Sequence, residues 1–296
     1  MTSAPNTTRA TLIGALAVPM WGTLALLTKL AGDIPPLQIE AMAFGTAFLL
    51  TCVVWGAKRR NPLPAFRQGL PVWALGIAGL FGYHYLYILA FQSAPAAEVN
   101  LINYLWPLLI VLFSALLPGQ RLTLPHVAGA ALGFAGTWVL IGAGANVSAA
   151  YLPGFMAAFG AAITWAAYSV LSRRYGDVPT DVVGGFCLAT AVLSGICHLL
   201  FETTVVPDAT GWLAILAMGM LPVGAAFFVW DHGCKRGDIR TLGAIAYATP
   251  LLSTLLLGLA GLAETGPRVW AACALIVGGA VLASGNLLRR RGAAAA

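Results

Sequence analysis

The sequence contains few charged residues: Asp, Glu, Lys and Arg together make up 9% of the chain, against roughly a quarter in soluble domains. Hydrophobic residues make up 59%, so a soluble fold would leave large apolar areas uncovered, whereas lipid accepts apolar surface on every side. The five cysteines form no CxxC pair, which predicts neither a disulfide framework nor a zinc site. These absences exclude a disordered chain and a disulfide scaffold, and they indicate a membrane protein.

Long apolar runs fill the chain instead, separated by short breaks that hold charged residues, proline or glycine. Each run approaches the ~20 residues that a helix needs to cross a bilayer. The breaks are too short to hold a soluble domain. The runs predict an all-α integral membrane protein with ten transmembrane helices, near residues 10–31, 36–57, 71–91, 96–117, 123–142, 153–173, 181–201, 211–232, 241–262 and 268–288.

The basic residues divide unevenly between the two sides that ten spans would create. Fourteen of the sixteen Lys and Arg residues fall on one side, and only Lys29 and Arg268 fall on the other. Cytoplasmic loops retain positive charge. The division therefore predicts a multi-pass protein with both termini in the cytoplasm.

The two halves of the chain repeat one another. A tryptophan and a GDxP turn recur at a shift of 144 residues, and a YxxPLL run recurs at a shift of 143, with six of eleven consecutive positions identical. The paired landmarks are Trp21 with Trp165, Asp33 with Asp177, and Pro107 with Pro250. We interpret residues 1–146 and 147–296 as two copies of one five-helix unit.

Because each copy has an odd number of spans, the second copy must enter the membrane in the opposite sense to the first. Inverted repeats of this kind recur in secondary transporters, where the substrate site lies near the membrane midplane between the halves. A duplication that serves only to build a stable bundle is the alternative.

This plan of five plus five inverted spans resembles the drug/metabolite transporter superfamily of EamA type, with Trp21 and Trp165 in the first span of each half and Pro107 and Pro250 in the fourth. The run Asn-Tyr-Leu-Trp-Pro at 103–107 is similar to that of bacterial aromatic amino acid exporters of the YddG type. The resemblance covers nearly the whole chain. It implies export of aromatic amino acids, and of aromatic cations or drugs as a further option, across the bacterial inner membrane.

Two tryptophans are the first candidates for substrate binding. Trp21 and Trp165 lie about midway along their spans, too deep for the aromatic belt at the membrane interface. Their faces can hold an aromatic ring or a cation, although core filling is the alternative. Tyr168 follows Trp165 by one turn and joins the predicted site.

The fourth span offers polar groups at membrane depth. Asn100, Asn103 and Pro107 share one helix face with Trp106 beside it. Pro107 leaves the carbonyl of residue 103 without its helical donor, and Pro250 does the same in the ninth span. We predict that the asparagines and Trp106 bind substrate and that the two prolines act as hinges. A packing kink, with the asparagines bonding neighbouring helices, is the alternative.

His84 is the last predicted substrate-binding residue. An ionisable group deep in a span is a functional candidate by default, against the alternative of a structural histidine. The ten carboxylates are all expected near span ends, with Glu40 at the outer side and Asp231 in a solvated cap at the inner side. No buried carboxylate relay is therefore expected.

These features predict a secondary transporter that works by alternating access and is not an enzyme. The alternative is a polytopic membrane enzyme acting on a lipid or isoprenoid, which would need a compact acidic or His-containing cluster. The sequence predicts no cofactor and no metal site. Its expected partners are a small-molecule substrate and the lipid bilayer, with no nucleic acid, and the chain is expected to act as a monomer.

Overall fold

The computed structural model describes residues 7–118, 122–141, 148–261 and 266–294, and within them every regular element is a helix. The first half contains α1 (Thr7–Ala15), α2 (Ala17–Gly22), α3 (Leu24–Ala31), α4 (Pro36–Ala57), α5 (Leu63–Phe66), α6 (Leu70–Ile77), η1 (Ala78–Gly82), α7 (Tyr83–Ser93), α8 (Ala96–Asn103), α9 (Trp106–Phe113), η2 (Ser114–Leu116) and α10 (Leu124–Ile141). The second half contains η3 (Ala149–Tyr151), α11 (Leu152–Leu171), η4 (Ser172–Tyr175), α12 (Val182–Phe201), α13 (Ala209–Met220), η5 (Leu221–Ala225), α14 (Ala226–Arg236), α15 (Ile239–Ala246), α16 (Ala248–Leu259) and α17 (Pro267–Ala294).

Eight helical stretches among the described residues are long and apolar enough to cross a membrane. They coincide with the predicted spans one to four and six to nine, because the lengths of the apolar runs set the lengths of the helices. Helices α10 and α17 lie where the fifth and tenth spans are expected. The eight are Thr7–Ala31, Pro36–Ala57, Leu70–Ser93, Glu98–Leu116, Ala149–Tyr175, Val182–Phe201, Ala209–Arg236 and Ile239–Leu259.

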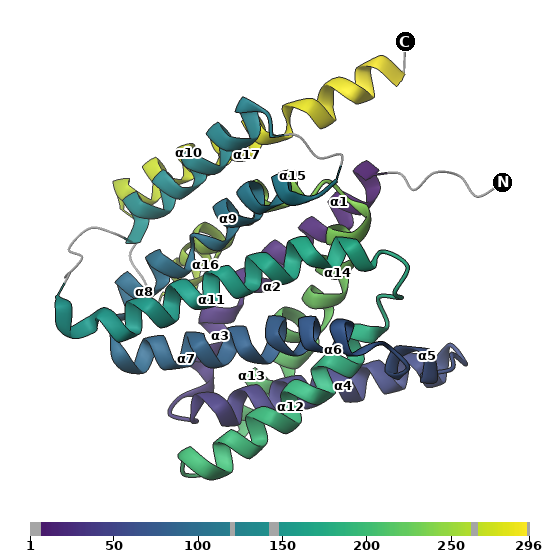
Figure 1. The fold of residues 1–296 in the computed structure, drawn as a ribbon. Coiled ribbons are helices and arrows are strands. Elements are labelled where there is room, and N and C mark those ends of the chain that lie inside the picture. The colour runs from purple at the N-terminus through teal and green to yellow at the C-terminus, as the bar shows by residue number, and fades with distance from the viewer. Residues whose placement is uncertain (1–6, 119–121, 142–147, 262–265, 295–296) are drawn as a thin grey trace.

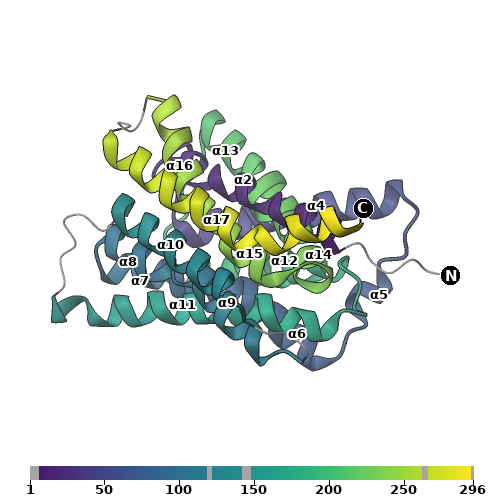
Figure 2. The same cartoon turned by 90° about the horizontal axis from the view of Figure 1, so that it is seen from above.

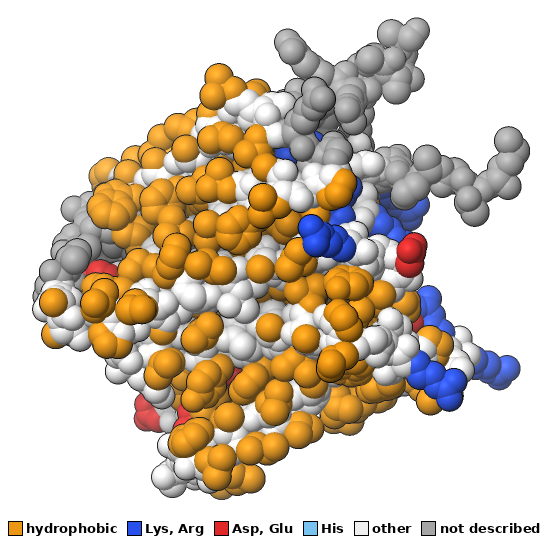
Figure 3. All heavy atoms as spheres, in the orientation of Figure 1, with side chains coloured by type: hydrophobic (Ala, Val, Ile, Leu, Met, Phe, Trp, Pro, Cys, Tyr) orange, Lys and Arg blue, Asp and Glu red, His pale blue; other side chains and the backbone are white. Residues whose placement is uncertain are grey.

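Hydrophobic side chains cover the face of the bundle shown in Figure 3, and Lys and Arg gather at its right end. The beginning of α1, the last turns of α17 and α5 all lie toward that same end of the bundle (Figures 1 and 2). An apolar wall with one basic end is the arrangement expected of a membrane protein whose basic loops share one side.

We expect reporter fusions to place residue 296 and the loop near residue 146 on opposite sides of the membrane, because five spans would separate them. A cytoplasmic fluorescent reporter and an external phosphatase reporter at each position provide the measurement. If both positions report the same side, the count of ten spans is wrong.

Helices of the first half pack against helices of the second half throughout the bundle. These pairs include α4 with α12, α7 with α11, α1 with α14, α9 with α15 and α10 with α17, and also α4 with α13 and α9 with α11. The two halves therefore interlock along their whole length, and side chains from both halves meet in the core of the bundle.

Two helices break just before a proline. The fourth span is interrupted between α8 and α9, where Leu105 N–H donates to the carbonyl of Ile102, three residues back, at 3.1 Å. Pro107, two residues later, has no N–H for the carbonyl of residue 103. The ninth span breaks in the same way at Tyr247, three residues before Pro250, with a bond from Tyr247 N–H to Ala244 O of 3.4 Å.

Two π-helical turns occupy matching places in the halves. They are η1 in the third span and η5 in the eighth, and their bounds differ by 143 residues at each end. This is the shift at which the YxxPLL run repeats. Gly79 in η1 lies directly against the ring of Tyr168, so a larger residue there would collide with Tyr168.

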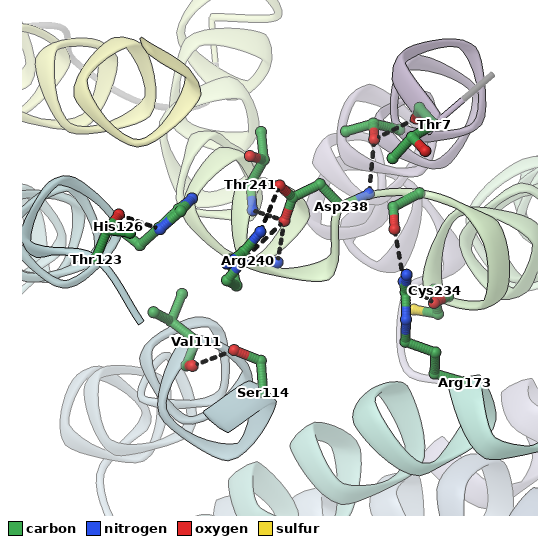
Figure 4. Close-up of polar contacts among 12 residues, drawn as sticks. Thr7, Val111, Ser114, Thr123, His126, Arg173, Cys234, Asp238, Arg240 and Thr241 are labelled. Carbon is green, nitrogen blue, oxygen red and sulfur yellow. Dashed lines mark hydrogen bonds and ion pairs between the residues drawn. The ribbon is translucent and has the colours of Figure 1, made fainter. Parts of the chain in front are cut away.

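The turn between α14 and α15 ties the basic end of the bundle together (Figure 4). Asp238 N–H donates to Thr11 Oγ1 of α1 at 2.8 Å, and Arg173 donates to the carbonyl of Gly237 at 2.6 Å. The Asp238 carboxylate accepts from Arg240 Nε at 3.1 Å and caps α15. Burial raises the pKa of Asp238, but the hydrogen bonds and charge of Arg240 outweigh it and hold the pKa below its usual value. The cap therefore stabilises α15 near neutral pH and is lost only as the pH falls through that lowered pKa.

Candidate functional site

Four tryptophans from four helices meet in the centre of the bundle. Trp21 of α2, Trp106 of α9 and Trp165 of α11 lie with ring centroids 5.7 to 6.3 Å apart. Trp230 of α14 lies 4.9 Å from Trp21 and stacks on Trp165 at 6.4 Å. The structure brings together the three tryptophans that the sequence predicted, and it adds Trp230. We name these four residues the tryptophan cluster.

Hydrogen bonds fix two rings of the tryptophan cluster. Trp21 Nε1 donates to the carbonyl of Pro222 in η5 at 3.0 Å, and Trp230 Nε1 donates to Ser169 Oγ at 3.0 Å. All four side chains are buried, and their edge-to-face, tilted and stacked contacts leave no gap between the rings for another aromatic ring. The cluster is closed in this structure, and an aromatic ligand would enter only if the rings moved apart.

A second group of rings extends the cluster toward α4 and α7. Phe227 of α14 lies 5.5 Å from Trp165 and stacks on Phe44 of α4 at 5.8 Å, with an interplanar angle of 12°. Tyr83 of α7 lies 5.3 Å from Trp165. The sequence analysis missed Phe44, Tyr83 and Phe227. Phe227 and Trp230 follow His84 and Tyr87 by 143 residues, so the repeat could have predicted Phe227 and Trp230. It gives no such signal for Phe44 or Tyr83.

His84 lies beside this second group. Its ring contacts Phe44 at 5.2 Å and Phe227 at 6.0 Å, and Nδ1 lies 2.6 Å from the carbonyl of Leu80. The backbone bond orients the imidazole, and the aromatic neighbours exclude water from much of it.

The two asparagines reach the site through tyrosines. Asn103 is buried, and its Nδ2 donates to the hydroxyl of Tyr83 at 3.2 Å. Asn103 Oδ1 has no hydrogen-bond partner among the described residues. Asn100 Oδ1 accepts from the Tyr87 hydroxyl at 2.6 Å. Asn100 therefore contacts Tyr87, which stacks on Tyr83, and not Tyr83 itself. Asn103 therefore offers a buried acceptor close to the tryptophan cluster, while Asn100 holds Tyr87.

Tyr168 connects the tryptophan cluster to a small cavity toward the basic end of the bundle. Its ring lies 5.2 Å from Trp165, and within the described part of the chain its buried hydroxyl has no hydrogen-bond partner. Asp231 and Lys235 line the same cavity and form an ion pair of 2.9 Å, with side chains 2% and 5% exposed. The expectation of a solvated cap at Asp231 is therefore wrong, because α11 and η4 cover this turn of α14.

Glu40 lies near the end of its span, as the sequence predicts, and it is buried there. Its Oε2 accepts a hydrogen bond from Ser194 Oγ of α12 at 2.9 Å, and its Oε1 lies 4.0 Å from His84 Nδ1. Glu40 is buried between α4 and its neighbours, an environment that the sequence analysis did not predict when it expected no buried carboxylate relay. The sequence places Glu40 only one turn into its helix and does not reveal that α7 and α12 cover it.

A bundle of apolar helices that buries a large aromatic cluster between two interlocked halves defines a polytopic membrane protein with an aromatic core. Comparison with known proteins makes the class specific. The family model described as the EamA-like transporter family matches residues 8–142 and again residues 152–285. The chain belongs to the EamA-like transporter family, as the sequence resemblance predicted, and the reading as a lipid-modifying enzyme finds no support.

Its relatives include several amino acid exporters. The aromatic amino acid exporter YddG of Ancylobacter novellus is 53% identical over 285 residues, which are 95% of this chain and 98% of the relative. The aromatic amino acid exporter YddG of Escherichia coli strain K12 is 28% identical, over 93% of this chain and 96% of the relative. The threonine/homoserine exporter RhtA of Salmonella typhimurium strain SL1344 is 27% identical over 72% of this chain and 70% of the relative.

A solved crystal structure has the same fold. It is similar with a TM-score of 0.91 and 52% sequence identity, and the match covers 96% of this chain and 98% of that chain. The helix arrangement described above is therefore shared along nearly the whole length of both proteins.

Proposed function

We propose that this protein is a secondary transporter that exports aromatic amino acids across the bacterial inner membrane. The observation that carries the proposal is the tryptophan cluster, built from Trp21, Trp106, Trp165 and Trp230. Two relatives that match more than nine-tenths of this chain are named aromatic amino acid exporters. Aromatic faces suit both the ring of such a substrate and, through cation–π attraction, its ammonium group.

The polar groups beside the cluster would bind the two charged ends of the substrate. Asn103 Oδ1 is a buried acceptor with no hydrogen-bond partner among the described residues, which suits an ammonium group. The hydroxyls of Tyr83 and Tyr168 can donate to a carboxylate near the same rings, while His84, whose Nδ1–H donates to the Leu80 carbonyl, leaves Nε2 as an acceptor. Asn100 would act by holding Tyr87 in place. A zwitterion has little net charge, so the site needs no unpaired protein charge.

Transport would proceed by alternating access between two inverted halves, residues 1–146 and 147–296. Numbering the ten expected spans in order, the packing pairs between the halves include 2 with 7, 4 with 9, 5 with 10, 3 with 6 and 1 with 8, together with 4 with 6 and 1 with 9. Exchanging each span with the one five places away maps this set onto itself, as a two-fold relation between the halves requires. The family model matches each half separately, and the π-helical turns recur at the shift of the sequence repeat.

The links at the basic end would have to open in each cycle. Arg173 and the turn after α14 form hydrogen bonds there, and Thr11 joins α1 to the same turn (Figure 4). The Thr11 bond connects the first half to the second, whereas the Arg173 bonds join η4 to the turn after α14 within the second half. With both termini cytoplasmic, this end would face the cytoplasm and would admit the substrate. One copy of the chain contains the whole site, so a monomer is sufficient.

We expect Pro107→Ala combined with Pro250→Ala to slow transport several-fold while the protein still inserts. Each alanine restores an N–H that can bond to the carbonyl four residues back and straighten the helix. Initial rates at matched expression provide the measurement. Pro267→Ala is the control, because proline at the first position of a helix such as α17 causes no break. Unchanged rates in the double variant would exclude a hinge role.

The proposed function is tested by release of amino acids from proteoliposomes that contain the purified protein. We expect phenylalanine, tyrosine and tryptophan to leave faster than from protein-free vesicles, while aspartate and lysine do not. Release of charged amino acids alone, or of none of the panel, would overturn the proposal.

A further inference from the structure

Glu40 is a buried carboxylate with incomplete hydrogen bonding. Its side chain is 9% exposed. Ser194 Oγ donates to Oε2 at 2.9 Å, whereas Oε1 has no hydrogen bond from any described residue. Buried polar atoms are nearly always paired, because an unpaired one has lost its water without compensation. A proton on this carboxyl group would remove the charge, so Glu40 is placed to bind and release a proton.

His84 lies next to the incompletely bonded oxygen. Its Nδ1 is 4.0 Å from Glu40 Oε1, slightly beyond hydrogen-bond distance. The same imidazole contacts Phe44, Tyr83 and Phe227, the rings that extend the tryptophan cluster. A change of charge on Glu40 alters its attraction to His84, and any movement of His84 shifts the rings at the aromatic site.

A polar stripe on α12 leads from Glu40 to the end of that helix farthest from α5 (Figure 1). Ser194, His198 and Glu202 follow one another at four-residue spacing and so share one face. His198 Nδ1 lies 2.9 Å from Glu202 Oε2, and its Nε2 lies 2.9 Å from Thr204 Oγ1. Glu202 also accepts from the N–H groups of Leu37 and Gln38 at the start of α4. Hydroxyl and titratable side chains therefore line one face of this helix between Glu40 and the outer end of the bundle.

We propose that Glu40, paired with His84, is a proton-binding site that couples entry of one proton to export of one amino acid. This inference rests on the proposed export function. A proton that arrives along the α12 stripe joins the Glu40 carboxylate and forms a neutral carboxylic acid. When the site opens to the cytoplasm, the carboxylic acid releases the proton and becomes a carboxylate again. No electron or other group is transferred.

The other titratable groups around Glu40 come from a few elements. Helix α12 contributes Cys197 and His198, and Glu202 follows its last residue; the charge of Glu202 acts on Glu40. Helix α7 contributes tyrosines besides His84. Helix α13 and the π-turn η5, which also pack on α4, contain no titratable side chain. The charged residues of α14 begin at Asp231, one turn beyond Phe227. His84 is thus the titratable side chain that directly faces Oε1.

The test uses proteoliposomes that are loaded with radiolabelled tryptophan and the pH dye pyranine. With the outside more acidic by about one pH unit, exchange of one proton per tryptophan can support up to about a tenfold tryptophan ratio. We expect the wild-type protein to release tryptophan faster with this gradient than without it. We also expect a tryptophan-dependent acidification of the lumen. The Glu40→Gln variant should show the same rate with and without the gradient, and no such acidification.

Asp33→Asn is the matched control, because Asp33 is an exposed carboxylate just before the same helix. It should retain the full response to the gradient. Glu40→Asp keeps a titratable carboxyl group on a shorter side chain, so it should retain a weaker response to the gradient. Size-exclusion chromatography shows whether Glu40→Gln folds. If Glu40→Gln does not fold, a full gradient response in Glu40→Asp would overturn the proton site. His84→Gln should weaken the response without abolishing it.

The outcomes separate the two proposals. If wild-type vesicles release no tryptophan under any gradient, the proposed function fails, and this inference fails with it. If they release tryptophan equally with and without the gradient and the lumen does not acidify, export stands and the proton site is overturned. A full gradient response in folded Glu40→Gln would also overturn the proton site and leave export intact.

Discussion

Trp165→Ala is expected to lower transport of aromatic amino acids by about tenfold or more, since each lost aromatic pair is worth ~0.5–1.5 kcal/mol and 1.4 kcal/mol is tenfold in binding. Trp165 lies at the centre of the site, because its ring contacts those of Trp21, Trp106, Trp230, Phe227, Tyr83 and Tyr168. Uptake or release of labelled phenylalanine and tryptophan at matched expression provides the measurement.

Two further variants separate a site effect from general damage. Trp212→Ala removes the same side chain from α13, where the tryptophan is 46% exposed on the outer surface, and should leave transport nearly unchanged. Trp165→Phe keeps an aromatic face and should recover part of the activity. If Trp165→Ala transports aromatic amino acids as fast as Trp212→Ala does, the tryptophan cluster is not the binding site.

The sequence predicted the helices and the core of the aromatic site well, for two physical reasons. Apolar run length sets the length of a membrane helix, so eight predicted spans match described helices within a few residues. Trp21 and Trp165 lie about midway along equivalent spans of the repeat, and at this depth the two rings meet, with centroids 5.7 Å apart. The same logic, applied at a shift of 143 to His84 and Tyr87, would have added Phe227 and Trp230.

The environment of the carboxylates could not be predicted in the same way. Position along a helix gives the depth of a residue in the membrane, but it does not tell which other helices cover it. Glu40 accepts a hydrogen bond from Ser194, which is 154 residues away in the chain. Asp231 is covered by α11 and η4. The π-turn at Ala78–Gly82 was also missed, because that segment contains no proline to signal a change of helix type.

The buried ion pair between Asp231 and Lys235 leads to the second large effect. We expect Lys235→Met alone to lower the free energy of unfolding by about 3–5 kcal/mol, because it leaves the Asp231 charge buried without its partner. Lys235 Nζ lies 2.9 Å from Asp231 Oδ2 and also donates to the carbonyl of Val178 at 3.1 Å. Thermal unfolding of the purified protein in detergent micelles provides the measurement.

Removing both charges should restore most of the lost stability, because replacing a buried pair by neutral side chains of similar size is often neutral or stabilising. The double variant Asp231→Asn with Lys235→Met should therefore be more stable than Lys235→Met alone. The exposed pair of Arg60 and Asp181, with side chains 52% and 33% exposed, is the control, and Arg60→Met should cost less than about 1 kcal/mol. If Lys235→Met costs no more than Arg60→Met, the pair is solvated in the folded protein and the cavity beside Tyr168 is open to water.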